Sequence, residues 1–169
     1  MKLADPNKID ESVFRLLDKD WMLITAGVAG KFNTMTASWG GFGVLWNQPV
    51  VFIFVRPPRF TYQFLEKNDY FTLSFFGKGF RDALNFCGSH SGRDVDKMAE
   101  TGLIPLTTEA GNIFFKDSRL VFECRKLYYH DLDPGKFLDT AIGKNYPKKD
   151  YHRMYIGRIE NCWISEDRS

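Results

Sequence analysis

The stretch WMLITAGVAGKFNTMTASWGG, residues 21–41, decides the fold. Its first part, WMLITAG, is mostly apolar and favours a β-strand, and the glycines of VAGKF then turn the chain. The residues that follow alternate between two faces, as side chains do along a strand. One face carries Asn33, Met35, Ala37 and Trp39, and the other carries Thr34, Thr36 and Ser38. The pattern predicts a hairpin.

The segments after this hairpin read as a strand, a helix and another strand. Residues 50–55, VVFIFV, are apolar without alternation, which predicts a strand covered on both faces and placed centrally or beneath a partner subunit. Two prolines end it. Residues 60–67 carry phenylalanines at helical spacing, and Thr61 could cap this short helix. Residues 70–76 then return to strand alternation.

The rest of the chain adds helices first and strands afterwards. Glycines at Gly88 and Gly102 would end helices over residues 80–87 and 94–101. Further strands are predicted over residues 120–129, 137–144 and 154–163, the second of them after a DPG turn.

This order of elements predicts one mainly β domain over residues 1–169. About seven strands, with a few helices inserted after the fourth, lack the regular strand–helix alternation of a parallel doubly wound sheet. An antiparallel barrel or sandwich is therefore expected, and closing the sheet would hide edges that an aromatic-rich chain would otherwise expose. The N-terminal tail and residues 164–169 are expected to be loose.

Composition excludes several classes of protein. The formal charge of +2 comes from 23 basic and 21 acidic residues spread along the chain, so a nucleic-acid backbone or an anionic membrane is an improbable partner. The three cysteines lack metal-binding spacing and fit a reducing compartment. No apolar run is long enough for a signal peptide or a membrane span. A cytoplasmic location is expected.

The segment NTMTASWGG, residues 33–41, is the first candidate for a binding site. Each residue has a structural explanation, because threonine suits strands, small residues make room and glycines allow bulges. Their combination offers side-chain donors, accessible backbone amides and the flat surface of Trp39. A planar heteroaromatic ring would use all three, and a flavin has that shape.

The segment VRPPRFT, residues 55–61, is the second candidate. Arg56 and Arg59 flank two rigid prolines, and the predicted helix begins near Thr61. The positive end of a helix and the donor fork of arginine both suit a phosphate monoester. The alternative is that the arginines are solvated loop charges.

The loop SHSGRDVDK, residues 89–97, is the third. Ser91, Arg93 and Lys97 could make a second anion contact, or the loop could be a polar surface with Asp94 capping the next helix. Serine, histidine and aspartate side by side on one loop rarely reach the geometry of a hydrolytic triad, and a GxSxG motif is absent. The sequence therefore provides no catalytic residue of this kind.

Metal and nucleotide motifs are also missing from the sequence. His90, His130 and His152 are far apart and lack metal-ligand spacing. Neither a GxGxxG turn nor a GxxxxGK[ST] loop occurs, so a nicotinamide cofactor would bind without a Rossmann unit.

Four motifs in this order resemble the flavin reductase-like family of the FMN-binding split-barrel fold, and its flavoredoxin-type members most closely. They are NTMTASWGG, VRPPRFTYQFLEKNDYFTLSFF, HSGRDVDK and DYHRMYIGRI, and the match spans about residues 15–163. The resemblance implies a split, Greek-key antiparallel β-barrel that forms a homodimer with one FMN per subunit near the interface. The cofactor-binding residues it implies are Asn33, Thr34, Met35, Thr36, Ala37, Ser38, Trp39, Arg56, Arg59, Thr61, Ser91, Arg93, Lys97, His130 and Trp163.

The function implied is that of an FMN oxidoreductase of the flavin reductase type. NAD(P)H or a redox protein would supply electrons, and the flavin would pass them to an acceptor. His152 either reaches the nicotinamide side or fixes the last strand. Three alternatives stay open: an electron-transfer carrier without turnover of its own, a single-strand nucleic-acid binder that stacks bases on aromatic residues, and a split-barrel relative that binds haem or stores flavin.

Overall fold

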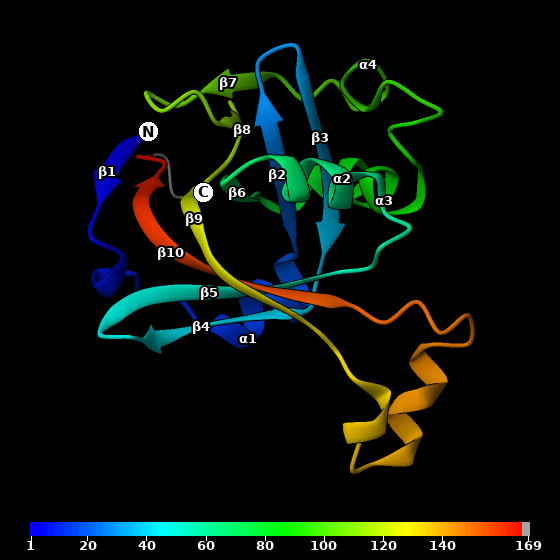
Figure 1. Ribbon diagram of the computed structural model, residues 1–169. Coiled ribbons are helices and arrows are strands. Elements are labelled where there is room, and N and C mark those ends of the chain that lie inside the picture. Colours follow the sequence, from blue (N-terminus) through cyan, green and yellow to red (C-terminus); the bar gives the residue numbers. More distant parts are fainter. Residues whose placement is uncertain (167–169) are drawn as a thin grey trace.

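The computed structural model describes residues 1–166 and is built around one antiparallel sheet (Figure 1). Its strands are β1 (Lys2–Ala4), β2 (Met22–Val28), β3 (Lys31–Ala37), β4 (Gly40–Leu45), β5 (Gln48–Val55), β6 (Tyr70–Phe75), β9 (Leu120–Asp131) and β10 (Arg153–Ile164). A separate two-stranded sheet pairs β7 (Pro105–Thr107) with β8 (Ile113–Phe115).

The strand order is β3-β2-β6-β9-β10-β5-β4, and β1 also pairs with β10. β3 and β4 follow one another in the chain, yet they lie at opposite ends of this order. The sheet therefore curls into a barrel that is split between them, and the short segment Ser38–Trp39 crosses the split. The fold is the mainly β, Greek-key split antiparallel barrel that we expected, and β5 is an internal strand between β10 and β4.

Short helices cover the barrel and its openings. They are α1 (Val13–Arg15), α2 (Phe60–Lys67), α3 (Arg81–Ser89) and α4 (Lys97–Thr101), with single turns η1 (Pro6–Lys8), η2 (Leu16–Asp20), η3 (Lys78–Phe80), η4 (Pro134–Lys136) and η5 (Thr140–Asn145). Among residues 1–166, none of these is a helix of the length and apolarity that a membrane crossing needs.

The two faces of β2 explain its apolar sequence. Met22 and Ile24 point into the barrel core, whereas Leu23 packs beneath α3 in a second cluster with Leu84 and Cys87. Because a strand covered on both faces has no solvent-facing position, its sequence does not alternate between apolar and polar residues. The cluster of Leu23, Leu84 and Cys87 thus fixes the position of α3 against β2.

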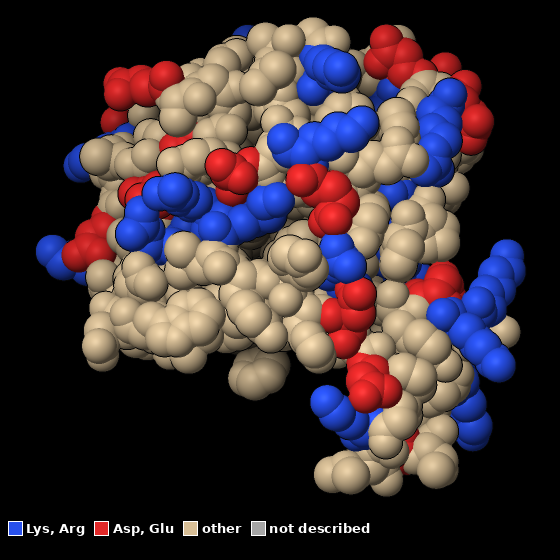
Figure 2. Space-filling view, viewed as in Figure 1, with Lys and Arg blue, Asp and Glu red and all other residues tan. Residues whose placement is uncertain are grey.

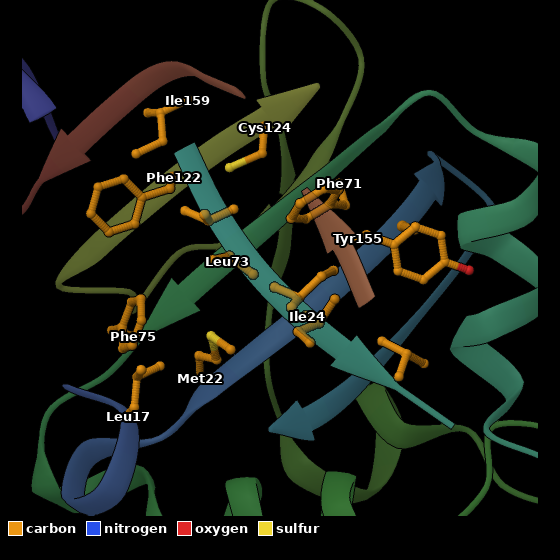
Figure 3. Packing of buried hydrophobic residues seen from close by; sticks show 14 of the residues in the cluster. Leu17, Met22, Ile24, Phe71, Leu73, Phe75, Phe122, Cys124, Tyr155 and Ile159 are labelled. Atoms are coloured by element: carbon orange, nitrogen blue, oxygen red, sulfur yellow. The ribbon is translucent and has the colours of Figure 1, made fainter. Parts of the chain in front are cut away.

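The barrel core combines aliphatic side chains with a few large aromatic ones (Figure 3). Phe71, Phe75 and Tyr155 are almost completely buried. Tyr155 reaches the wall of the core next to α2, where its hydroxyl donates to Glu66 Oε1 at 2.6 Å. A side chain at Gly157 would place its Cβ 2.6 Å from Phe71 Cζ, so β10 needs glycine there. Phe71 and Phe75 thus serve packing.

Residues 137–144 are not the strand that we expected. They form part of an excursion, residues 132–152, that contains η4 and η5 and extends away from the barrel (Figure 1, orange). Asp133 and Asp139 each accept a hydrogen bond from a backbone amide two residues on, at 2.9 and 2.8 Å. These aspartate turns satisfy the backbone locally, and Leu138 is left fully exposed.

Several smaller predictions were wrong at element ends. The N-terminal tail is anchored, because Lys2–Ala4 pairs with the end of β10. Thr61 does not cap α2, since the cap position is Arg59 and the Thr61 side chain turns into the core instead. Gly88 does not end α3, which runs on to Ser89, and the cap of α4 is Asp96 rather than Asp94.

Other expectations about element ends are confirmed. Gly102 adopts a left-handed conformation with φ 69° and ends α4 as expected. The strand β4 was missed, because GGFGVL follows the hairpin without an alternating polar face. Of the tail expected to be loose, Ile164 belongs to β10 and Ser165 donates to Arg119 O, and residues 167–169 lie outside the described residues.

Candidate functional site

A cavity of about 450 Å³ opens where the barrel is split, and we call it the arginine cavity. It is bounded by the end of β3, the following Ser38–Trp39 link, β5, the turn after β5 and α3. Its lining residues are Met35, Thr36, Ala37, Ser38, Trp39, Phe54, Arg56, Arg59, Gly88, Asp150 and His152. The segments NTMTASWGG and VRPPRFT, which lie far apart in sequence, thus meet at one opening.

Arg59 projects into this cavity from a tight turn. Its backbone amide donates to Arg56 O at 3.0 Å, which closes the turn around the two prolines. One guanidinium nitrogen, Nη1, donates to Gly88 O at 2.8 Å. Burial, and then the nearby charge of Arg56, lower the pKa of Arg59, although arginine stays charged in proteins. Arg59 makes no ion pair within the described chain, so its charge is available to a ligand.

Arg56 is held differently. Its Nη1 atom lies 3.2 and 3.1 Å from the two carboxylate oxygens of Asp150, and Nη2 donates to Asn145 O at 2.8 Å. Its guanidinium also lies 5.1 Å from the centre of the Tyr146 ring. All three partners belong to the excursion of residues 132–152. The two arginines therefore do not act as an equal pair, because Asp150 neutralises one of them.

A second cavity of about 220 Å³ adjoins the first, and we call it the loop cavity. Met35 and Arg59 line both. Inside it, Asn33 Nδ2 donates to Thr61 Oγ1 at 2.7 Å and joins β3 to the first turn of α2. The loop that follows α3 covers this pair. A Cβ atom at Gly92 would lie 2.0 Å from Asn33 Oδ1, so only glycine allows this approach.

Arg93 and Ser91 hold the same loop against the arginine turn. Arg93 Nη1 donates to Pro58 O at 3.1 Å, and its guanidinium lies 4.9 Å from the centre of the Phe60 ring. Ser91 Oγ accepts from the Arg93 amide at 3.2 Å. Both side chains line the loop cavity, together with Asn33, Thr61 and Lys97.

Lys97 is a buried lysine, with only 6% of its surface exposed. Its Nζ atom donates to Thr34 O at 2.8 Å and to Cys87 O at 2.9 Å, so it joins β3, α3 and α4. Burial lowers the pKa of Lys97 to about 8, the Cys87 thiol opposes this shift, and the charge of Arg59 adds to it. Two of its three donors thus serve the protein scaffold.

Trp39 and His152 form the aromatic wall of the arginine cavity. Trp39 is 47% exposed, and its ring centre lies 5.2 Å from that of His152. His152 is buried, and its Nδ1 atom is 2.8 Å from the Tyr146 hydroxyl. Burial, and then the charge of Arg56, lower the pKa of His152 to about 4, while Asp150 opposes the shift. The imidazole is therefore neutral at pH 7.

Not all predicted residues lie at these cavities. Thr34 is buried between strands, 2.9 Å from Thr25 Oγ1. His130 lies exposed on β9 opposite Met154, and its ring stacks on Tyr128 at 6.4 Å. Trp163 lies at the far end of β10 and stacks on Phe114 at 6.2 Å. Neither His130 nor Trp163 lines the arginine or loop cavity.

Some lining residues were not predicted from the sequence. Asp150 lines the arginine cavity only because the excursion folds back, and Tyr146 of the same excursion contacts Arg56 and His152. Phe54 and Gly88 line the cavity without a binding motif around them in the sequence. His152 lies in the motif DYHRMYIG, which marks it in the sequence but does not specify whether it faces a ligand. Within residues 1–166, no group of three or more His, Cys, Asp or Glu side chains is arranged to hold a metal ion.

Comparison with known proteins identifies the family. The model of the family described as flavin reductase like domain matches residues 14–169. The chain belongs to this family. No match is found among curated proteins.

Solved structures of flavin proteins share this fold. The FMN-binding protein of Thermus thermophilus, with bound p-hydroxybenzaldehyde, is 22% identical over 99% of this chain and 83% of its own, with a TM-score of 0.71. Flavoredoxin of Methanosarcina acetivorans is 25% identical over 96% of this chain and 77% of its own, with a TM-score of 0.67.

An NADH:FAD oxidoreductase of Streptomyces globisporus, in complex with NAD and FAD fragments, is also similar. It is 18% identical over 89% of this chain and 77% of its own, with a TM-score of 0.66. Relatives of this flavin reductase-like fold thus include an oxidoreductase and a flavoredoxin.

Proposed function

We propose that this flavin reductase-like protein binds FMN at the arginine and loop cavities and transfers electrons through it. The observation that carries the proposal is the meeting of Arg59, the start of α2 and the Trp39 surface at one opening. A phosphate needs a cation and backbone donors, and a flavin ring needs a flat apolar surface with polar groups at its rim.

The donor groups present fit FMN. Arg59 and the first amides of the eight-residue helix α2 would hold the phosphate, with Thr61 and Asn33 beside them. Ser38 and Thr36 offer hydroxyls next to the ring position, although Thr36 already donates to Leu84 O at 2.5 Å. Trp39, half exposed beside the cavity, would contact the ring.

Bound FMN would supply the redox chemistry, accepting electrons from NAD(P)H or from a redox protein and passing them to an acceptor. The residues of the chain would bind the FMN and orient its ring. The loop that carries Gly92 and Arg93 shields the phosphate end from water, because it packs onto Asn33 and Pro58. Neutral His152 would place an uncharged hydrogen-bonding group beside the ring.

The test is to purify the protein, record its absorption spectrum, identify any released cofactor and titrate the protein anaerobically with NADH and with NADPH. We expect one FMN per chain and reduction of the flavin by one of the two nicotinamides. A folded protein that is colourless and takes up no FMN would contradict the proposal. A haem spectrum would do so as well.

The second candidate function is that of an electron carrier with no turnover of its own. The similarity to a flavoredoxin, at 25% identity, favours its consideration. A carrier would bind FMN and accept electrons from a reduced protein partner, but excess NADH or NADPH would not be oxidised. After the anaerobic titration, air is admitted as the electron acceptor and the oxidation of excess NADH or NADPH is followed. Continued oxidation indicates an enzyme, and its absence indicates a carrier.

We also propose that the protein is a homodimer. Val44 and Trp46 lie at the β4–β5 hairpin with 74% and 55% of their surface exposed, and Tyr128 lies 6.5 Å from the Trp46 ring centre. The surface over β4 and β5 is largely free of charged side chains (Figure 2). A contact with a second copy would explain these features.

Sedimentation equilibrium tests this association. We expect a dimer for the unchanged protein, and a monomer for Trp46→Glu, which would bury a charge in the contact. Leu138→Glu is the matched control, because Leu138 is equally apolar and fully exposed but lies on the excursion. A wild-type protein that stays monomeric at all concentrations would refute the dimer.

A further inference from the structure

A cavity of about 620 Å³, which we call the apolar cavity, lies beside the arginine cavity. Ser38, Trp39 and Phe54 line both and form the wall between them. The remaining walls come from α1 and η2, from the start of β4 and from the excursion of residues 132–152. Its volume is in the range of pockets that hold small organic ligands, roughly 300–1,000 Å³.

The lining of the apolar cavity restricts the chemistry of a ligand. Its apolar lining includes Val13, Phe14, Leu17 and Leu132. Its one charged lining residue is Asp18, which already pairs with Lys19 at 2.6 Å, and no lysine, arginine or histidine lines it within the described chain. An anion would therefore lose its hydration without gaining a cation. The cavity suits an uncharged molecule and disfavours the diphosphate of a dinucleotide.

One polar link connects this cavity to the arginine cavity. Tyr146 lines the apolar cavity and His152 lines the arginine cavity, and their side chains are joined by the 2.8 Å contact between the hydroxyl and Nδ1. A tyrosine hydroxyl has one donor and two acceptor positions. When His152 Nδ1 donates, the hydroxyl keeps its proton for a ligand carbonyl or hydroxyl group, and when the hydroxyl donates to Nδ1 it can still accept from a ligand hydroxyl group.

We propose that the apolar cavity binds an uncharged ring compound with a carbonyl or hydroxyl group, placed next to the redox site across the Trp39 wall. The assignment of this compound as the substrate rests on the proposed function, whereas its binding does not. The excursion thus has two tasks: Asp150 holds Arg56 on one side of the wall, and Leu132 and Tyr146 complete a pocket on the other.

Calorimetric titration tests the charge preference with two probes of nearly equal shape. These are 4-methoxyacetophenone, which is uncharged, and 4-methoxybenzoate, which is an anion at pH 7. We expect the ketone to bind and the carboxylate to bind at least tenfold more weakly. Equal binding of both probes, or no binding of the ketone, would overturn the proposal.

Two variants test whether the ketone binds in the apolar cavity. Leu132→Trp fills it and should weaken ketone binding at least tenfold, whereas Leu138→Trp makes the same change at a fully exposed position of the excursion and should leave binding unchanged. If Leu132→Trp does not fold, Phe14→Asp serves, because Phe14 is 87% exposed and its loss leaves the core intact. Unchanged ketone binding in the folded cavity variant would refute the assignment.

The same samples are titrated with FMN. If FMN binds and the ketone does not, this inference fails and the proposed function stands. If the ketone binds and FMN does not, the proposed function fails and this inference stands. If FMN displaces the ketone competitively, the apolar cavity belongs to the FMN site and the separate pocket is disproved.

Discussion

The arginine cavity and the apolar cavity share one wall, yet their other walls differ in charge. The arginine cavity is lined by Arg56 and Arg59, and the apolar cavity by side chains such as Leu17 and Leu132. Trp39 suits the wall between them, because an indole offers an apolar face to each side. One split in a barrel can therefore present a charged lining and an apolar lining side by side.

The largest expected effect is a loss of FMN affinity when Arg59 of the arginine cavity is replaced. Arg59→Met removes the guanidinium that has no carboxylate partner in the described chain. Hydrogen bonds to charged groups contribute ~1.5–3 kcal/mol, and those to the phosphate would be lost. We therefore expect FMN affinity to fall roughly 10- to 100-fold by fluorescence titration. Riboflavin, which lacks the phosphate, should bind equally well to variant and wild type.

Arg125→Met is the control, because Arg125 is exposed on β9 and lines neither cavity. Ketone binding in the apolar cavity should also be unaffected by Arg59→Met. An equal loss of riboflavin and FMN affinity would show that Arg59 does not hold the phosphate.

The next effect concerns the cover of the loop cavity. Gly92→Ala places a methyl group 2.0 Å from Asn33 Oδ1, so the loop must move away. Overpacking of this kind costs about 1–3 kcal/mol. Urea unfolding should show this loss, whereas Gly79→Ala, where a Cβ meets nothing within 4 Å, should not. Equal stability of the two variants would mean that the loop does not pack on Asn33.

The third effect concerns His152, which lines the arginine cavity and contacts Tyr146 of the apolar cavity. The pKa of His152 is lowered to about 4 in the folded protein from an ordinary value of 6.5. Between these values the unfolded chain binds a proton that the folded chain does not, so stability falls as the pH falls from 6.5 to 4. The expected loss is on the order of 1–3 kcal/mol.

Urea unfolding at a series of pH values measures it. His152→Gln should flatten this part of the curve, whereas the exposed His90→Gln should leave the curve unchanged. A curve that keeps its slope in His152→Gln would assign the pH dependence to other groups.

The smallest effect on FMN binding is expected at Lys97, which lines the loop cavity. Lys97→Met leaves Thr34 O and Cys87 O without their donor, which costs about 1–3 kcal/mol of stability. Because the pKa of Lys97 is lowered to about 8 from 10.5, wild-type stability should rise with pH between these values, and the variant should lose that rise. FMN affinity should change less than twofold if Lys97 serves only the scaffold. A larger change would place its third donor at the ligand.

Local sequence patterns identified β2, β3, β5, β6, β9 and β10 and the end of α4 at Gly102. They also identified the two arginines that flank the prolines after β5. They also singled out Asn33, residues 35–39 and Thr61, which the fold brings around the arginine and loop cavities. These features depend on neighbours a few residues away, such as alternation and helix capping, so they can be read from the chain.

Tertiary structure alone decided which arginine is free and where the apolar cavity lies. Arg56 meets Asp150 across 94 positions of sequence, and residues 137–144 look like a strand but have no neighbouring strand to pair with in the described chain. Whether a charge is neutralised, or an apolar residue becomes a pocket wall, depends on which distant segment folds against it. That is set by the closing of the whole barrel, because long-range contacts leave no periodic signal in the sequence.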